Sequence, residues 1–205
     1  MSNNTATIKT RENLVSTRTI TMTALLAAIS YVLAFLEFPV PLSPSFARMD
    51  LSDLPALIGA FAFGPVTGVM IELIKNILQL LSTSTGGIGE FANFLMGASY
   101  VLAAGFIYRY KKKKAIWACV ISSIVMGIAA AIVNYFILLP LFETFMPLDQ
   151  LIASFGEFLP FIKTKLDVVL FNALPFNILK GLVIGAITMM IYKKLTPILK
   201  GENLK

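Results

Sequence analysis

The stretch Arg109-Tyr110-Lys111-Lys112-Lys113-Lys114 separates two apolar segments, each long enough to cross a bilayer. Four consecutive ammonium groups resist transfer across a membrane, and short loops rich in Lys and Arg stay on the cytoplasmic side. This stretch therefore assigns one loop to the cytoplasm. The other loops can be assigned by counting membrane crossings from it.

The composition is that of an integral membrane protein. Of the 205 residues, 57% are hydrophobic and only 14% are charged, whereas soluble domains carry about 25% charged residues. The mean hydropathy is +0.81. The net charge of +6 then reports orientation in the cell membrane and not affinity for nucleic acid. We expect one integral membrane domain over residues 1–205, with a disordered cytoplasmic tail at residues 1–17.

Four apolar segments are long enough to span the membrane: Thr19–Phe38, Phe91–Tyr108, Ala115–Leu141 and Leu166–Tyr192. A fifth apolar region, Leu54–Leu81, is too long for one straight span and is interrupted by Gly64-Pro65. Proline disrupts a helix interior, and Gly-Pro favours a turn. This region therefore holds either one broken span or two short ones.

The distribution of charge favours two short spans. Six spans place three basic clusters on one side: Lys9, Arg11 and Arg18; Arg109 to Lys114; and Lys193, Lys194, Lys200 and Lys205. The opposite side then receives mostly acidic residues, among them Glu37, Asp50, Asp53, Glu90, Glu143, Asp149, Glu157 and Asp167. We predict an all-α membrane protein with six transmembrane helices, the second and third short, and both termini in the cytoplasm.

Several classes of chemistry are absent from the sequence. The chain has no histidine, which excludes histidine-based metal sites and Ser-His-Asp triads, and its one cysteine, Cys119, cannot form an internal disulfide. No nucleotide-hydrolysing motif is present. We expect neither a metal nor a resident cofactor, and we expect that the protein is not an enzyme.

Three ionisable residues fall within apolar segments: Glu72, Lys75 and Lys180. A charge within a membrane costs about 2.5–3.5 kcal/mol on insertion scales, so each needs a partner or a hydrated site. Glu72 and Lys75 are three residues apart and can pair with each other, as a structural ion pair or facing a ligand. Lys180 has no acidic neighbour within its own helix, which favours a ligand or a cavity beside it.

Two amides and two loops complete the candidate site. Asn177 shares a helix face with Lys180, just after Pro175, and Asn134 lies deep in another apolar segment. Either amide could bind a ligand or a neighbouring helix. The proline-rich loop that leads into Phe46 and Asp50, and the flexible loop with Gly86 and Gly87, are suited to gating an outer opening.

The stretch from Phe38 to Pro65, FPVPLSPSFARMDLSDLPALIGAFAFGP, resembles the riboflavin-binding S components of energy-coupling factor (ECF) transporters. The later stretches Glu72-Leu-Ile-Lys75-Asn76 and Asn177-Ile-Leu-Lys180 resemble them too, and the similarity extends over nearly all the apolar segments.

The resemblance implies a subunit that captures riboflavin as a transported ligand and docks on a transmembrane T component, which carries two cytoplasmic ATPases. It implies ligand binding by Asn134, Asn177 and Lys180, a lid between the first two helices, and docking through an Ala-x-x-x-Ala motif at Ala24 and Ala28.

Three alternatives remain open from the sequence. An S component for another vitamin would share the fold and the docking alanines. A gradient-driven carrier or small channel would use Glu72 and Lys75 as a relay. A membrane-embedded enzyme is disfavoured because no histidine and no paired carboxylates lie within the apolar segments.

Overall fold

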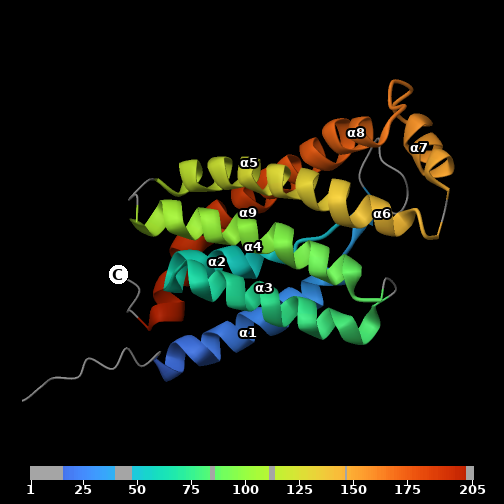
Figure 1. The fold of residues 1–205 in the computed structure, drawn as a ribbon. Coiled ribbons are helices and arrows are strands. Elements are labelled where there is room, and N and C mark those ends of the chain that lie inside the picture. Colours follow the sequence, from blue (N-terminus) through green and yellow to red (C-terminus); the bar gives the residue numbers. More distant parts are fainter. Residues whose placement is uncertain (1–15, 40–47, 84–85, 111–113, 146, 202–205) are drawn as a thin grey trace, which may run out of the picture.

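The computed structural model describes residues 16–39, 48–83, 86–110, 114–145 and 147–201, which form a bundle of helices (Figure 1). Its α-helices are α1 (Thr17–Ala34), α2 (Asp53–Phe63), α3 (Pro65–Gln79), α4 (Ile88–Tyr110), α5 (Ala115–Val133), α6 (Leu139–Phe142), α7 (Leu148–Gly156), α8 (Lys165–Val168) and α9 (Leu174–Lys200). The shorter elements are a 3-10 turn, η1 (Leu80–Ser82), two π-helical turns, η2 (Asn134–Leu138) and η3 (Val169–Ala173), and an antiparallel pair of strands, β1 (Phe38–Pro39) and β2 (Arg48–Met49).

The π-helical turns join neighbouring helices into longer ones. Through η2, α5 and α6 form a continuous helix of 28 residues, and through η3, α8 and α9 form one of 35 residues. Together with α1 and α4, these are the four helices in the described part of the chain that are long and apolar enough to cross a membrane. The helices α2 and α3 are shorter, with 11 and 15 residues.

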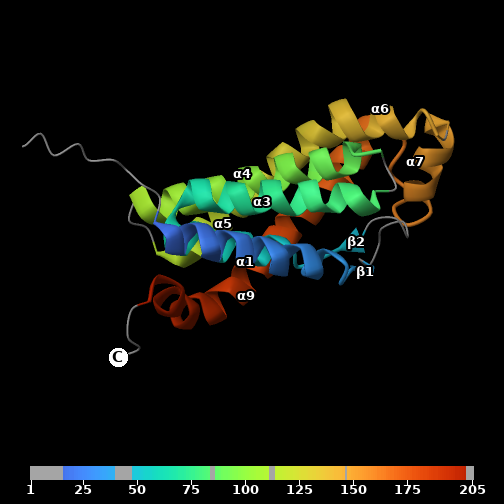
Figure 2. The same ribbon diagram turned by 90° about the horizontal axis from the view of Figure 1, so that it is seen from below.

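The long helices lie side by side along roughly one common direction, whereas the short α7 lies across one end of the bundle (Figures 1 and 2). Helix α9 packs against α5 and α2, and α4 packs between α3 and α5. Helix α1 packs on α2 and α3 and lies at one edge of the bundle in Figure 1.

The break between α2 and α3 is at Gly64, as the sequence predicts. Gly64 has φ 116°, which side-chain-bearing residues rarely adopt, and Pro65 opens the next helix. The Arg109 side chain donates a 2.6 Å hydrogen bond to the Phe63 carbonyl oxygen at the end of α2. A Cβ atom on Gly64 would also meet the Arg109 guanidinium, but that group is the flexible end of a side chain, so the backbone conformation is the main reason for glycine here.

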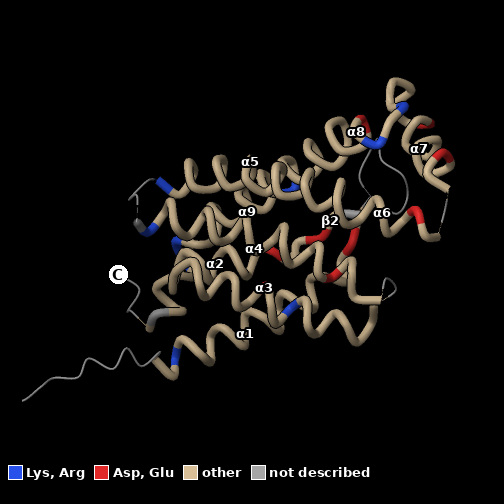
Figure 3. The backbone as a smooth tube through the Cα atoms, viewed as in Figure 1, with Lys and Arg blue, Asp and Glu red and all other residues tan. Residues whose placement is uncertain are grey.

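Charge is divided between the two ends of the bundle (Figure 3). The basic end combines the start of α1 with the ends of α4 and α9. Arg18 of α1 donates hydrogen bonds of 2.6 and 2.7 Å to the Leu199 and Ile198 carbonyl oxygens, which ties the first helix to the last. Most acidic side chains lie toward the other end, where the strands, α6 and α7 are found (Figure 3).

The outer faces of the helices are apolar. Large hydrophobic side chains such as Trp117, Ile132 and Met190 are more than half exposed, which is typical of surfaces that contact lipid. Inside the bundle, Gly181 and Gly185 allow close packing, because a Cβ atom there would lie within 3 Å of Ser123 or Cys119.

Asp53, which the charge count assigns to the outer side of the membrane, is fully buried at the start of α2, where it pairs with lysines inside the bundle. The segment between α6 and α8 contains α7, whose Leu151 and Phe155 are buried in a small hydrophobic cluster. The expected tail at residues 1–17 falls almost entirely outside the described residues, and α1 begins at Thr17.

Candidate ligand-binding site

A cavity of about 360 Å³ lies toward the acidic end of the bundle. Its walls come from α4, α7, the helix that contains η2, the helix that contains η3, and the segment just before α2. The lining residues are Glu37, Asp50, Gly89, Asn93, Met96, Asn134, Leu138, Leu139, Phe142, Leu151, Phe155, Val168, Asn172, Ala173, Phe176, Asn177 and Lys180. The volume falls within the range of about 300–1,000 Å³ that is usual for small-molecule sites.

Four residues selected from the sequence meet at this cavity: Asp50, Asn134, Asn177 and Lys180. They come from three separate parts of the chain. The structure therefore brings together the two amides and the lysine that the sequence analysis selected, and it adds Asp50 beside the lysine.

The π-helical turns set the positions of the amides. Pro140 and Pro175 each follow a π-helical turn by two residues, and the wider turn accommodates a ring that would clash within a regular α-helix. Asn134 and Asn177 each donate a 2.8 Å hydrogen bond to the carbonyl oxygen four residues earlier. Because an amide has two N–H donors and an acceptor, each side chain retains one N–H and its oxygen for another partner.

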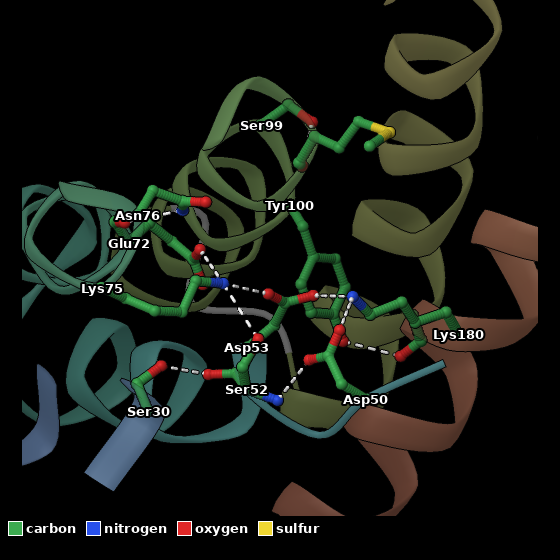
Figure 4. Close-up of polar contacts among 12 residues, drawn as sticks. Ser30, Asp50, Ser52, Asp53, Glu72, Lys75, Asn76, Ser99, Tyr100 and Lys180 are labelled. Carbon is green, nitrogen blue, oxygen red and sulfur yellow. Dashed lines mark hydrogen bonds and ion pairs between the residues drawn. The ribbon is translucent and has the colours of Figure 1, made fainter. Parts of the chain in front are cut away.

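A chain of ion pairs continues from the cavity wall into the bundle (Figure 4). The Lys180 ammonium lies 3.3 Å from an Asp50 oxygen and 3.1 Å from an Asp53 oxygen. Asp53 also pairs with Lys75 at 2.8 Å, and Lys75 pairs with Glu72 at 2.6 Å. We call these five residues the ionic cluster.

The ionic cluster changes the interpretation of Lys180. Its own helix offers no carboxylate, as the sequence indicates, but two carboxylates reach it from the start of α2 and the segment before it. Lys180 therefore has protein partners besides the cavity that it lines. Asp50 is itself held in place, because its other oxygen accepts a 2.7 Å hydrogen bond from the Ser52 backbone N–H.

Glu72 and Lys75 pair with each other but do not line the cavity. Both are fully buried, and Lys75 also donates a 3.0 Å hydrogen bond to the Ser52 hydroxyl. Their contacts are those of a structural cluster behind the cavity wall.

Part of the cavity wall is apolar. Leu139, Leu151, Phe155 and Val168 line it and belong to one small hydrophobic cluster that joins α6, α7 and α8. Lys165, at the start of α8, pairs with Glu143 at the end of α6. Helix α7 is thus packed as a cover on the cavity.

The remaining sequence candidates lie elsewhere. Gly86 and Gly87, with φ of 63° and 92°, form the turn before α4 and are not among the residues that line the cavity. Phe46 lies outside the described residues. Ala24 and Ala28 are exposed on α1, on the side away from the buried Ala27.

The sequence analysis did not select several lining residues. Asn93 and Asn172 are amides within apolar segments, so the criterion that selected Asn134 would have found them. Leu151 and Phe155 carried no such signal, because apolar residues in a loop indicate neither a helix nor a cavity wall by themselves.

The helical bundle, its apolar exterior and its partly polar cavity define a membrane protein that can hold a small organic ligand. The sequence profile described as "ECF transporter, substrate-specific component" matches residues 18–192. The chain belongs to this family, and it is a transporter component, not an enzyme.

Known relatives agree with this assignment. "Riboflavin transporter RibU" of Staphylococcus aureus (strain TCH60) is 38% identical over 180 residues, which cover 86% of this chain and 89% of the relative. "Riboflavin transporter FmnP" of Bacillus subtilis (strain 168) is 33% identical over 179 residues, covering 85% and 90%. A solved structure described as "Structure and mechanism of the S component of a bacterial ECF transporter" is 37% identical, with a TM-score of 0.69, and the match covers 89% of this chain and 98% of that one.

Proposed function

We propose that this chain is a riboflavin-capturing S component, which binds the vitamin in the cavity beside Lys180 and delivers it through an ATP-driven ECF complex. The observation that carries the proposal is the cavity, which has amides and a lysine on one side and a hydrophobic cluster on the other. The relatives named as riboflavin transporters match most of the chain and supply the choice of ligand.

Riboflavin complements both sides of the cavity. The ligand is a flat tricycle, whose pyrimidinedione edge carries carbonyl acceptors and an N–H donor and whose opposite edge is a dimethylbenzene. The spare N–H and oxygen of Asn134 or Asn177 match an acceptor and donor on the polar edge. The Lys180 ammonium can serve a carbonyl or a ribityl hydroxyl, with Asp50 holding it at the cavity wall.

The apolar side suits the rest of the ring. Leu151 and Phe155 of α7 are 3% and 6% exposed and line the cavity. Burying the ring against them would remove apolar surface from water at about 25 cal/mol per Å². We assign α7 as one cover of the site and the segment that includes Phe46 and Asp50 as the other, with Gly86 and Gly87 at its rim.

We place the protein in the plasma membrane. The proposed topology has six membrane spans, with both termini in the cytoplasm. The basic end of the bundle, with Arg18, Arg109 and Lys114, would then face the cytoplasm. The cavity would open toward the outside, where a captured nutrient arrives. Helices α2 and α3 would complete the count as short spans.

The partners we propose are a transmembrane T component and the two cytoplasmic ATPases that it carries. Ala24 and Ala28 are exposed at a four-residue spacing on α1, and small side chains at this spacing allow another helix to approach closely. The neighbouring Leu25 and Ile29 are 51% and 43% exposed, so the same face offers apolar area for docking.

Ligand identity can be tested with the purified protein. Expressed in riboflavin-containing medium and purified in detergent, the protein should carry the absorption spectrum of a bound flavin. Apo protein should quench riboflavin fluorescence at one ligand per chain, and excess thiamine or biotin should not compete. Saturable binding of another vitamin with no response to riboflavin would refute the assignment.

Topology can be tested with single cysteines in a Cys119→Ala background. An impermeant maleimide applied to intact cells should label Asp149→Cys, which is exposed on α7, and should not label Lys193→Cys until the cells are opened. Labelling of Lys193→Cys in sealed cells would reverse the orientation.

A further inference from the structure

The ionic cluster holds an odd number of charges. It contains three carboxyl groups, on Asp50, Asp53 and Glu72, and two ammonium groups, on Lys75 and Lys180, so with every group ionised its net charge is −1. The side chains of Asp53, Glu72 and Lys75 are fully buried. An uncompensated charge inside an apolar bundle costs several kcal/mol. Some positive charge must therefore complete the cluster.

A second observation points to the same place. Asn76, which is only 4% exposed, donates a 2.8 Å hydrogen bond from its amide nitrogen to the Glu72 backbone oxygen. This bond fixes the amide orientation, and the Asn76 Oδ1 atom is then buried with no donor in the described part of the structure. The Glu72 Oε1 atom is buried without a donor as well. The two acceptors come from residues one helical turn apart on α3, and neither has a hydrogen-bond donor (Figure 4).

Among the described residues, Lys75 is the one cation that pairs with Glu72. Lys75, on the same helix, lies 2.6 Å from Glu72 Oε2, but it also serves Asp53 and the Ser52 hydroxyl. Helix α4 packs against Glu72 with Gly97, where a Cβ atom would lie 2.6 Å from the carboxylate. The Tyr100 hydroxyl, also on α4, already donates to the Gly181 carbonyl oxygen at 2.7 Å.

The other two carboxyl groups are better compensated. Asp53, on α2, contacts the ammonium groups of both Lys75 and Lys180. Asp50, before α2, contacts Lys180 of α9 and accepts the Ser52 backbone N–H, and its side chain is 16% exposed. Glu72 is the carboxyl group with the least positive charge around it.

We propose that Glu72 is a proton-binding site: its side chain is a neutral carboxylic acid that donates from Oε1 to Asn76 Oδ1 and accepts from Lys75 at Oε2. A single proton balances the cluster at two negative and two positive charges. It also provides the donor that both buried oxygens lack.

The bound proton sets the charge behind the ligand cavity. Loss of the proton would draw Lys75 toward Glu72 and leave Asp53 more dependent on Lys180, which lines the cavity. Lys180 would then be less available to a ligand. This consequence rests on the proposed function, whereas the proton site itself does not.

The first test compares two isosteric variants without any ligand. Glu72→Gln keeps a neutral group that can donate to Asn76 and accept from Lys75, so it should unfold within a few degrees of the wild-type melting temperature in detergent. Asp53→Asn removes a charge shared by two lysines and should unfold at a much lower temperature. If Glu72→Gln is destabilised as much as Asp53→Asn, Glu72 is ionised and the proposal is wrong.

The second test measures stability against pH. The folded wild type would bind one proton more than the unfolded chain, so its stability should fall as pH rises. Relative to Glu72→Gln, its unfolding equilibrium constant should increase about tenfold per pH unit at pH values above the ordinary range of a Glu carboxyl group, where the unfolded chain has lost the proton and folded Glu72 still keeps it. Parallel pH profiles for the two proteins would overturn the proposal, as would wild-type stability that follows the concentration of Na⁺ or K⁺ and not pH.

The third test separates the proton site from the ligand assignment. The infrared carbonyl band of a protonated carboxylic acid should be present in the wild type and absent from Glu72→Gln. Riboflavin affinity should weaken at alkaline pH in the wild type, and this dependence should be lost in Glu72→Gln. A missing infrared band refutes the proton site, whereas a band without any riboflavin binding refutes only the proposed ligand.

Discussion

The cavity wall and the ionic cluster behind it are both built from polar residues in apolar helices, but they differ in how far those residues are satisfied. Asn134 and Asn177 each use one N–H within their own helix and keep hydrogen-bonding groups that can face a ligand. Lys75 and Asp53 are fully buried and form ion pairs with each other and with their neighbours Glu72 and Lys180. Asn134 and Asn177 thus combine unused hydrogen-bonding groups with a place at the cavity, whereas Lys75 and Asp53 have neither a place at the cavity nor a charge without a partner.

Lys180 joins these two regions. It lines the cavity, and it also pairs with Asp50 and Asp53. Mutations in the cluster should act mainly on folding, and mutations in the wall mainly on affinity.

The largest effect is expected from Lys75→Met. This change leaves Asp53 and Glu72 without their shared ammonium group, and breaking a buried ion pair costs about 3–5 kcal/mol. Thermal unfolding in detergent should show a large loss of stability. Lys193→Met, at an exposed position on α9, is the control and should unfold like the wild type.

Double variants sharpen this prediction. Lys75→Met with Asp53→Asn leaves Lys180 balanced by Asp50 and should recover part of the lost stability, whereas Lys75→Met with Glu72→Gln leaves two aspartates on one lysine and should not. If Lys75→Met alone is as stable as the wild type, the cluster does not hold the bundle together.

A smaller effect is expected from Asn177→Ala in the cavity wall. A ligand group left unpaired in a dry site costs about 1–3 kcal/mol, which corresponds to a roughly ten- to hundredfold loss of riboflavin affinity. The melting temperature should change little, because the lost bond lies within one helix. Fluorescence quenching measures the affinity, and Gln150→Ala, exposed on α7, is the control.

No effect on riboflavin binding is expected from Ala28→Trp on α1. Ala28 is exposed and does not line the cavity, so riboflavin affinity should stay at the wild-type value. Uptake by cells that express the whole transporter should be lost, because a bulky side chain keeps a partner helix at a distance. Ile132→Trp, on the exposed face of α5, should leave both unaffected. Loss of binding in Ala28→Trp would show that this face serves the fold of the subunit itself.

Features that depend on neighbouring residues could be predicted from the sequence. The break at Gly64-Pro65, the pairing of Glu72 with Lys75 and the common face of Asn177 and Lys180 all follow from helical spacing. The amides of the cavity wall could be found because burying an amide in an apolar segment is energetically costly. Asn93 and Asn172 meet the same criterion but were not selected.

Features that depend on contacts between distant parts of the chain could not be predicted from the sequence. Asp53 and Lys180 lie on α2 and α9, and no local pattern indicates that these helices pack together. The cover formed by α7 is equally inaccessible to sequence, because Leu151 and Phe155 become cavity residues only through their packing on α6 and α8. The excess of one carboxyl group over the ammonium groups in the cluster can be counted only when the structure shows which five residues contact one another.

The most direct test of the account is an experimental structure of the protein with riboflavin bound. We predict that the flavin occupies the cavity, with its pyrimidinedione edge at Asn177 and Lys180 and its dimethylbenzene edge against Leu151 and Phe155. Lys75, Asp53 and Glu72 should remain paired behind the wall, out of contact with the ligand. A flavin bound elsewhere in the bundle, or one that contacts Lys75 and Glu72 directly, would contradict the division between cavity and cluster.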